Sequence, residues 1–287
     1  MNQKVEVNRV YRGLRRRMNR GKPIDSFPFL SGDSYFYSCQ FYFKSSEIHR
    51  VPSAPGRTQK LKSIFLKVSE IDQFILFLNS RDQGHYKDYS LVLHNGDDTI
   101  LPSELRQLEA RFRKVYAVNL LSPGENSTPI PIGLENHNYF TNGIPSDFRK
   151  LLALGLKSTQ NRTYTLLQSF SLHTNRTERE VCSFVGNRLG CKLLDHASPK
   201  DYRKALSNSK FVLSPAGNGY DCHRTWEAMY LGAIPIVRRI HWPFVDFSLP
   251  VLVIEEWDEL LEIDLSSVPV IQSFTWSEDF WNDFFHG

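Results

Sequence analysis

The sequence predicts an α/β protein of two domains, each with an open sheet of strands and covering helices. The chain has 287 residues, which exceeds the usual size of a single hydrophobic core. Short apolar, strand-prone segments alternate with segments of helical periodicity along both halves of the chain. Hydrophobic residues make up 41% and charged residues 23%, as in ordinary globular proteins. No apolar run reaches the ~20 residues that a membrane-spanning helix needs.

The first half contains strand-then-helix steps. A β-prone segment is followed by a helical repeat of apolar residues, and the step recurs behind Pro102. The expected elements are strand 63–68, helix 70–78, strand 90–94, helix 103–112 and strand 114–118. These elements predict a small α/β domain.

The alternation stops in a segment rich in Pro, Gly and Asn, residues 122–145, and resumes after the polar residues 157–162. A short helix is expected between them, over 146–154. The predicted domains are therefore 1–155, 156–265 and a C-terminal aromatic segment, 266–287. The second domain is expected to hold strand 164–170, helix 177–187, strand 191–194, helix 199–207, strand 211–214, helix 221–231, strands 234–237 and 250–254, and helix 256–261. Because helices separate most of these strands, we expect a parallel sheet.

The two ends of the chain have unusual compositions. Residues 1–22 combine many Lys and Arg residues with apolar residues at helical spacing, which predicts a basic amphipathic helix. Such a helix either packs on its own domain, contacts an anionic membrane or binds nucleic acid, and the last lacks a supporting motif. Residues 274–285 are rich in Phe and Trp, which predicts a terminal helix packed back on the first domain. Without a signal sequence, a cytoplasmic location is expected, with peripheral membrane contact as an option.

The segment Phe211–Val237 combines a strand, a Gly-rich turn, a helix and a second strand. Gly217 and Gly219 allow the backbone to approach a ligand, and the following helix directs its unpaired N–H groups to the same place. Arg224 can bind an anion, and Glu227 lies one turn further along the helix. This pattern predicts a site for a nucleoside diphosphate, formed by Ser214, Pro215, Gly217, Asn218, Gly219, Tyr220, Arg224 and Glu227.

The same segment has other interpretations. Asp221 could be an ordinary N-cap, with Arg224 and Glu227 forming an exposed ion pair. The dinucleotide-binding pattern G-x-G-x-x-G fails because Cys222 occupies the third glycine position, and the Walker pattern lacks its Gly-Lys-Ser/Thr.

Phe211–Val237 resembles the C-terminal signature of exostosin-like glycosyltransferases, in which Pro-Arg-Gly precedes a helix with Arg-x-x-Glu-Ala and then Gly-x-Ile-Pro-Val. The matching residues are Pro215, Gly217, Arg224, Glu227, Ala228, Gly232, Ile234 and Pro235. The segments 170–175 and 131–134 also resemble such enzymes. The sequence departs from the pattern at Ala216, where the family has Arg. Either Arg224 suffices, or Arg179 or Arg188 compensates, or activity is weak.

The resemblance implies two Rossmann-like domains that face a cleft, the GT-B fold. It implies a nucleotide-sugar donor held by the C-terminal domain and an acceptor that approaches the N-terminal one. By similarity, Arg224 contacts the diphosphate, and Glu227 contacts ribose or sugar hydroxyls. The expected co-substrate is a UDP- or GDP-linked sugar, with no other cofactor.

Catalysis requires stabilisation of the leaving diphosphate and often a base for the acceptor hydroxyl. The sequence has no Asp-x-Asp motif and no C-x-x-C pair, so no metal is expected. The candidate bases are Asp33, Asp97, Asp98 and Glu135, each in or near a turn, with His137 and His173 as further options. All of these side chains also occur at such positions for purely local reasons.

The function we expect is transfer of a sugar from a nucleotide diphosphate to a glycan or lipid-linked acceptor, as in surface polysaccharide or glycoconjugate biosynthesis. Two alternatives remain open. One is a nucleotide-sugar-binding protein without catalysis, which Ala216 favours. The other is an adaptor that binds a membrane surface or nucleic acid through the basic residues 1–22.

Overall fold

The computed structural model describes residues 26–53, 61–81, 86–137, 143–195, 197–244 and 249–268. It divides the chain into two compact units. Of the described residues, 26–132 and 219–221 form the N-terminal unit, and 133–218 and 222–268 form the C-terminal unit. The predicted domain boundary after residue 155 stays a prediction. The basic segment 1–22 and all but the first three residues of 266–287 lie outside the described residues.

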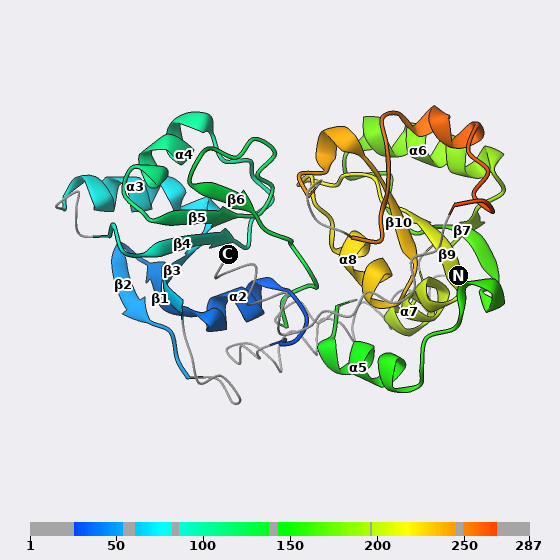
Figure 1. Ribbon diagram of the computed structural model, residues 1–287, viewed down its shortest axis with the longest axis horizontal. Helices are drawn as coiled ribbons and strands as arrows, with labels where there is room; N and C mark the ends of the chain where they lie inside the picture. Colours follow the sequence, from blue (N-terminus) through cyan, green and yellow to red (C-terminus); the bar gives the residue numbers. More distant parts are fainter. Residues whose placement is uncertain are drawn as a thin grey trace. The chain divides into compact units, whose positions relative to one another are not determined.

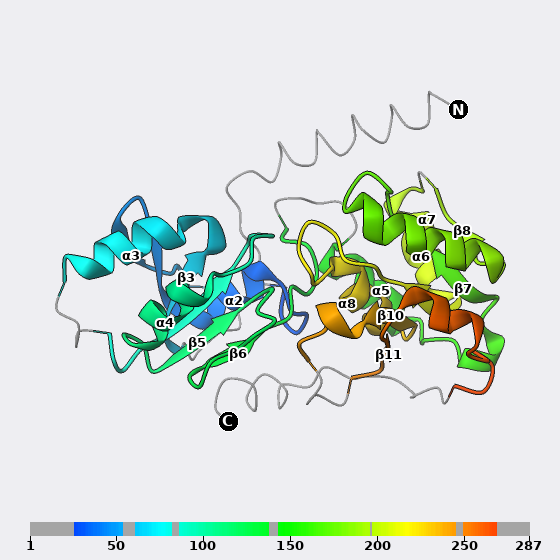
Figure 2. The same ribbon diagram turned by 90° about the horizontal axis from the view of Figure 1, so that it is seen from above.

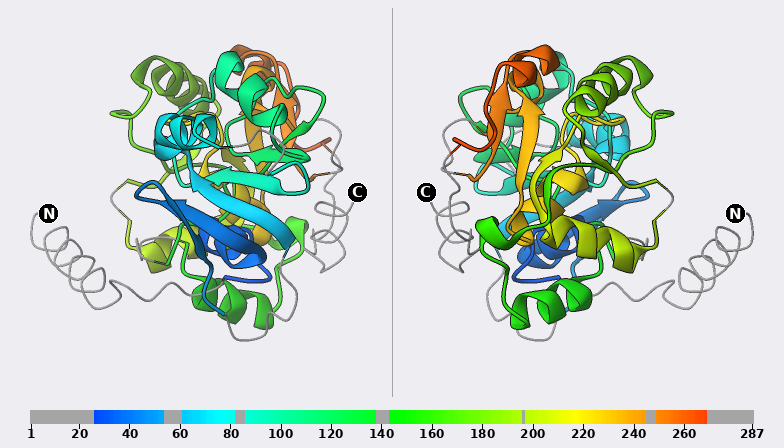
Figure 3. Two further views of the ribbon diagram at one scale, coloured as in Figure 1. Left: turned by 90° about the vertical axis from the view of Figure 1, so that its left-hand side faces the viewer. Right: turned by 90° about the vertical axis from the view of Figure 1, so that its right-hand side faces the viewer.

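The N-terminal unit has a six-stranded sheet in the order β2-β1-β3-β4-β5-β6. Strand β2 pairs antiparallel with β1, and the other neighbouring strands pair in parallel. The strands are β1 Cys39–Lys44, β2 Glu47–Arg50, β3 Leu61–Lys67, β4 Ser90–His94, β5 Lys114–Ala117 and β6 Ser127–Pro129. Helix α2 (Gly32–Ser38) covers one face, and α3 (Ile71–Asn79, behind the short η1, Val68–Glu70) and α4 (Pro102–Glu109) lie on the other (Figures 1 and 3).

Each predicted element of the first half is present, with ends that differ by a few residues. The elements α2, β1, β2 and β6 were not predicted. Helix α2 contains Tyr35, Phe36 and Tyr37, residue types that are common in strands. It begins at a capping box in which Ser31 and Ser34 exchange side-chain-to-backbone hydrogen bonds.

The C-terminal unit has a five-stranded sheet in the order β11-β10-β9-β7-β8, and every neighbouring pair is parallel. The predicted parallel sheet is therefore confirmed. Its strands are β7 Tyr164–Gln168, β8 Lys192–Leu193, β9 Ser209–Leu213, β10 Ile234–Arg238 and β11 Leu252–Ile254. Both units are thus α/β with mostly parallel sheets, as the sequence predicts.

Helices cover both faces of this sheet, as Figures 1 and 2 show. Helix α6 and the 3₁₀ segment η4 pack together on one face, and α7 and α8 pack together on the other. The bounds are α5 Pro145–Ala153, η2 Thr159–Asn161, α6 Arg176–Arg188, α7 Pro199–Ser207, α8 His223–Tyr230, η3 Arg239–His241 and η4 Trp257–Leu261. A buried cluster that includes Leu166, Phe211, Ile236 and Trp257 forms the core between the sheet and the α6 face.

Two predicted helices differ in form. Residues 257–261 form a 3₁₀ helix rather than an α-helix. Helix α8 begins at His223, two residues after the predicted start. The Asp221 carboxylate accepts a hydrogen bond from the Ile132 amide (2.8 Å) and not from the first turn of the helix. The interpretation of Asp221 as the helix N-cap is therefore wrong, and Cys222 is the N-cap. Among the helices that the structure describes, none is long and apolar enough to cross a membrane.

Candidate functional site

The candidate site lies where the connections of the C-terminal sheet change direction. Strands β7 and β9 are neighbours, although β8 lies between them in the sequence. From β7 the chain continues through α6 to β8 at one edge, and from β9 it continues through α8 toward the other edge. The loops after β7 and β9 therefore separate at the carboxyl end of the sheet. This place, between the loop that begins at Ser169 and the loop that begins at Ser214, is called the switch point below. Open α/β sheets bind ligands at such places.

Arg224 joins the ends of these two strands. Its Nε donates to the Ser169 carbonyl after β7 (3.0 Å). Its Nη1 lies 3.5 Å from both the Ser214 hydroxyl and the Pro215 carbonyl after β9. Nη2 has no hydrogen-bond partner among the residues that the structure describes. The guanidinium is thus fixed at the switch point by neutral acceptors and keeps its positive charge for a ligand.

Helices α6 and α8 both begin at this end of the sheet. Their N-cap residues are Asn175 and Cys222, and neither side chain caps the first turn. The first-turn N–H groups of a helix are otherwise satisfied by a capping side chain, water or a ligand. Together with the helix dipole, such amides favour an anion at this end of the sheet.

The Gly-rich loop divides between exposed and buried residues. Gly217 is half-buried and Asn218 is exposed, whereas Ser214, Pro215 and Gly219 are buried. The Ser214 hydroxyl pairs with the Thr225 hydroxyl (2.8 Å), so this side chain secures α8 to the end of β9. At least one residue of the predicted diphosphate site therefore has a structural role, and the site itself stays a prediction.

Gly219, Tyr220 and Asp221 belong to the N-terminal unit. There the Asn119 amide oxygen accepts from the Asp221 amide (3.0 Å). A Cβ at residue 219 would lie 2.7 Å from Asn119 Nδ2, so only glycine fits without displacing this side chain. The second glycine of the loop is therefore explained by packing against Asn119.

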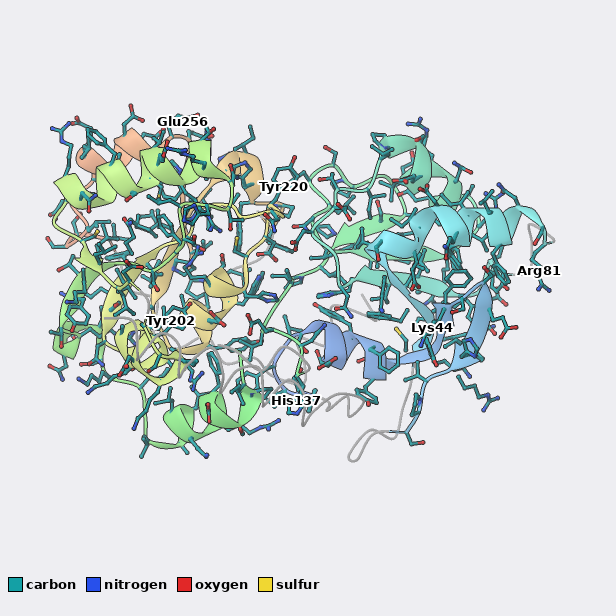
Figure 4. The ribbon with its side chains drawn as sticks, turned by 180° about the vertical axis from the view of Figure 1, so that it is seen from behind. Lys44, Arg81, His137, Tyr202, Tyr220 and Glu256 are labelled. Carbon is teal, nitrogen blue, oxygen red and sulfur yellow. The ribbon has the colours of Figure 1, made fainter. Side chains whose placement is uncertain are left out.

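Glu227 is buried in the C-terminal unit, with 2% of its surface exposed. The Tyr202 hydroxyl of α7 donates to Glu227 Oε2 (2.6 Å), and Oε1 has no hydrogen-bond partner among the described residues. Burial, and next the Glu135 carboxylate, raise the pKa of Glu227 to about 7. The interpretation of Arg224 and Glu227 as an exposed ion pair is therefore wrong. Figure 4 labels Tyr202 in this unit.

The other candidate bases are distributed over both units. Asp33 is buried in the first turn of α2, and Asp97 and Asp98 are exposed after β4, all in the N-terminal unit. Glu135 lies in the C-terminal unit, close enough to Glu227 to raise its pKa. His137 is half-buried and His173 exposed. The structure brings Glu135, Glu227 and Arg224 into one electrostatic neighbourhood.

Sequence reasoning missed Tyr202 and Asn119. Tyr202 lies in a helix whose bounds were predicted correctly, but its contact with Glu227 joins residues from α7 and α8. Asn119 follows a predicted strand and has φ of 56°, a left-handed conformation that Asn adopts more readily than most residues. An Asn at a strand end is the signal that could have drawn attention to it. No group of three or more His, Cys, Asp or Glu residues in the described part of the chain is arranged to hold a metal ion.

One comparison with known proteins bears on this unit. The model of the family described as "RXYLT1 C-terminal domain" matches residues 159–266, which include β7, β9, Arg224 and Glu227. The family is related to xylosyltransferases, so the match points to a glycosyltransferase-type function. No curated protein matches the sequence significantly.

Proposed function

We propose that this chain is a glycosyltransferase that moves a sugar from a nucleotide diphosphate sugar to a glycan or lipid-linked acceptor. One observation carries the proposal. Arg224 is fixed across the carboxyl ends of β7 and β9, with Glu227 one turn further along the same helix. The similarity of residues 159–266 to the RXYLT1 C-terminal domain family supports the same reaction type.

In this proposal Arg224 contacts the diphosphate, and Glu227 accepts hydrogen bonds from hydroxyls of the ribose or the sugar. One observation supports the second role. Glu227 Oε1 has no hydrogen-bond partner among the described residues, and a buried polar atom without a partner is costly. A donor hydroxyl would remove that cost on binding. The base stays among Asp33, Asp97, Asp98 and Glu135, and the nucleotide is UDP or GDP.

We further propose a metal-independent reaction. Guanidinium groups and helix N-termini stabilise negative charge on a leaving diphosphate, which is the task of the metal in other enzymes. The wider proposal is a GT-B enzyme of the exostosin-like type that acts in surface polysaccharide or glycoconjugate biosynthesis. Its proposed location is the cytoplasm, with residues 1–22 in peripheral contact with an anionic membrane.

Calorimetry of the full chain in EDTA tests the donor site. We expect UDP or GDP to bind without divalent metal, and one of a panel of UDP- and GDP-linked sugars to be hydrolysed or transferred. Binding that disappears in EDTA contradicts metal independence. Binding without any turnover over the panel indicates a nucleotide-sugar-binding protein, and no binding of either nucleotide contradicts the proposed donor site.

A further inference from the structure

A second arginine shares the switch point with Arg224. Arg179 belongs to the first turns of α6 and is 6% exposed. Its Nε donates to the Ala216 carbonyl (3.0 Å), and its Nη1 donates to the Ser171 carbonyl (2.7 Å). Arg179 therefore joins the loop after β7 to the loop after β9, as Arg224 does at residues closer to the strand ends.

The two guanidinium groups lie against one ring. The Cζ atom of Arg179 is 5.7 Å from the centroid of the Phe170 ring, and that of Arg224 is 5.2 Å from it. Burial, and next the Arg224 charge, lower the pKa of Arg179. Two like charges held close together repel each other, and an aromatic face and carbonyl dipoles offset this only in part.

No acidic side chain in the described part of the chain forms an ion pair with either arginine. Glu178, the neighbour of Arg179, instead accepts hydrogen bonds from Arg238 (2.9 Å) and from the Trp257 indole (2.8 Å). Glu256, which Figure 4 shows beside α6, pairs with the same Arg238. The Arg224 charge acts to lower the pKa of Glu227, but Glu227 makes its hydrogen bond with Tyr202. The carboxylates near this end of α6 are thus engaged elsewhere, and the charge of the arginine pair is left for a ligand.

We propose that Arg179 is a second diphosphate-binding residue, which acts with Arg224 and supplies the positive charge that Ala216 does not. The inference rests on the proposed donor site. A diphosphate carries charge on two phosphate groups, and two guanidinium groups from separate helices match it better than one. Arg179 donates a hydrogen bond to the carbonyl of Ala216. Its charge therefore lies next to the backbone from which an arginine side chain at residue 216 would extend.

Arg188 offers a matched control. It ends the same helix, is exposed, and has its Cζ atom 6.0 Å from the Phe184 ring centroid. Arg188→Gln removes the same charge from the same helix as Arg179→Gln, but at the opposite end of α6. Arg188 is therefore not the compensating residue in this proposal.

The test is calorimetry of the full-length protein in EDTA, with inorganic pyrophosphate and with inorganic phosphate as probes. We expect Arg179→Gln to weaken pyrophosphate binding by about ten- to a hundredfold, the effect of one lost hydrogen bond to a charged group. Phosphate binding should change by less than about threefold, because Arg224 still holds one phosphate group. Arg179→Lys should recover part of the pyrophosphate affinity, and Arg188→Gln should bind both probes like the wild type.

The outcomes separate this inference from the proposed function. If Arg179→Gln binds pyrophosphate like the wild type, while Arg224→Ala does not, the donor site stands and the role of Arg179 is overturned. If Arg179→Gln and Arg179→Lys weaken both probes equally and lower the melting temperature, Arg179 is a structural link between loops and the inference is again overturned. A wild-type protein that binds neither probe nor any nucleotide overturns the donor site and, with it, the inference.

Discussion

Arg224 has a structural and a proposed chemical task, and the two can be separated. Its hydrogen bonds to the Ser169 and Pro215 carbonyls hold two loops together. Negative charge grows on the diphosphate as it leaves, so an arginine beside it stabilises the transition state more strongly than the bound donor. We therefore expect Arg224→Ala to lower kcat by about 10²- to 10³-fold, as when a charge-stabilising donor is removed from other enzymes. Glu227→Gln should mainly raise the donor KM, because hydroxyls bind similarly in both states.

Steady-state kinetics on a demonstrated donor measure both effects. Arg239→Ala is the control, since Arg239 is exposed in the same unit and pairs with Glu255. If Arg224→Ala and Glu227→Gln both fold and retain wild-type kcat and KM, the assignment of the site is wrong.

Glu227 makes a pH-dependent contribution to stability. Burial and Glu135 raise its pKa to about 7, against the smaller opposing influences of Tyr202, Arg224 and Arg203. A carboxyl group whose pKa is raised in the folded state does not lower the free energy of unfolding at pH values below its unfolded pKa of ~4.3, because it is protonated in both states. The loss of stability grows as the pH rises and is complete above the folded pKa, at about pH 7. We compare the free energy of unfolding of Glu227→Gln with that of the wild type. We expect this difference to shift in favour of the variant by roughly 2–4 kcal/mol between pH 4 and pH 8.

Urea unfolding of both proteins at several pH values between 4 and 8 measures this difference. Glutamine keeps an oxygen that accepts from the Tyr202 hydroxyl, so the hydrogen bond is preserved. Glu180→Gln is the control, because Glu180 is exposed and pairs with Arg176 on the surface of α6. A stability difference for Glu227→Gln that does not change with pH contradicts the raised pKa.

At the scale of the elements, α6 is placed by its contact with the sheet. Gly186 is buried in the middle of the contact, and a Cβ there would lie 2.6 Å from Leu213 Cδ1 and 3.1 Å from Gln168 Oε1. Leu213 is completely buried. Alanine favours a helix over glycine by about 1 kcal/mol. Overpacking of a core costs about 1–3 kcal/mol, so we expect Gly186→Ala to be destabilising.

Chemical unfolding of Gly186→Ala tests this, with Asn187→Ala as the control on the exposed side of the same helix. The control should be neutral or slightly stabilising, because it changes only helix propensity. A stabilised Gly186→Ala protein would show that α6 does not pack on β9 at this residue.

Regular elements were predicted where the hydrophobic pattern and the terminating residues agree. Helix α7, Pro199–Ser207, has its predicted bounds because Ser198 caps its start and Pro199 follows at the first position. Strand β4, Ser90–His94, is buried throughout, and its apolar run is short and bounded. Helix α2 was missed because its aromatic residues favour a strand, whereas burial and the Ser31–Ser34 capping box determine a helix.

At the scale of the whole molecule, the two sheets share one feature of strand order. In each, the first strand lies between two strands that follow it in the sequence, but β2 is antiparallel to β1 whereas β8 is parallel to β7. The units are not consecutive in the chain, since Gly219–Asp221 belongs to the N-terminal unit although its neighbours on both sides belong to the other. Asp221 explains this, because its carboxylate and amide bind Ile132 and Asn119.

The sequence alone determined the α/β class, most strands and helices, and the Gly-rich loop that precedes the helix of Arg224, because these depend on local periodicity, turn residues and glycine spacing. The tertiary structure decided which side chains meet. It buried Glu227 against Tyr202, directed Asp221 away from α8, and placed Arg179 beside Arg224. Each of these outcomes depends on contacts between residues far apart in the chain, and local pattern contains no information on the partner. The choice between Arg179 and Arg188 illustrates this, since both lie on α6 and only the packing of this helix on the sheet distinguishes them.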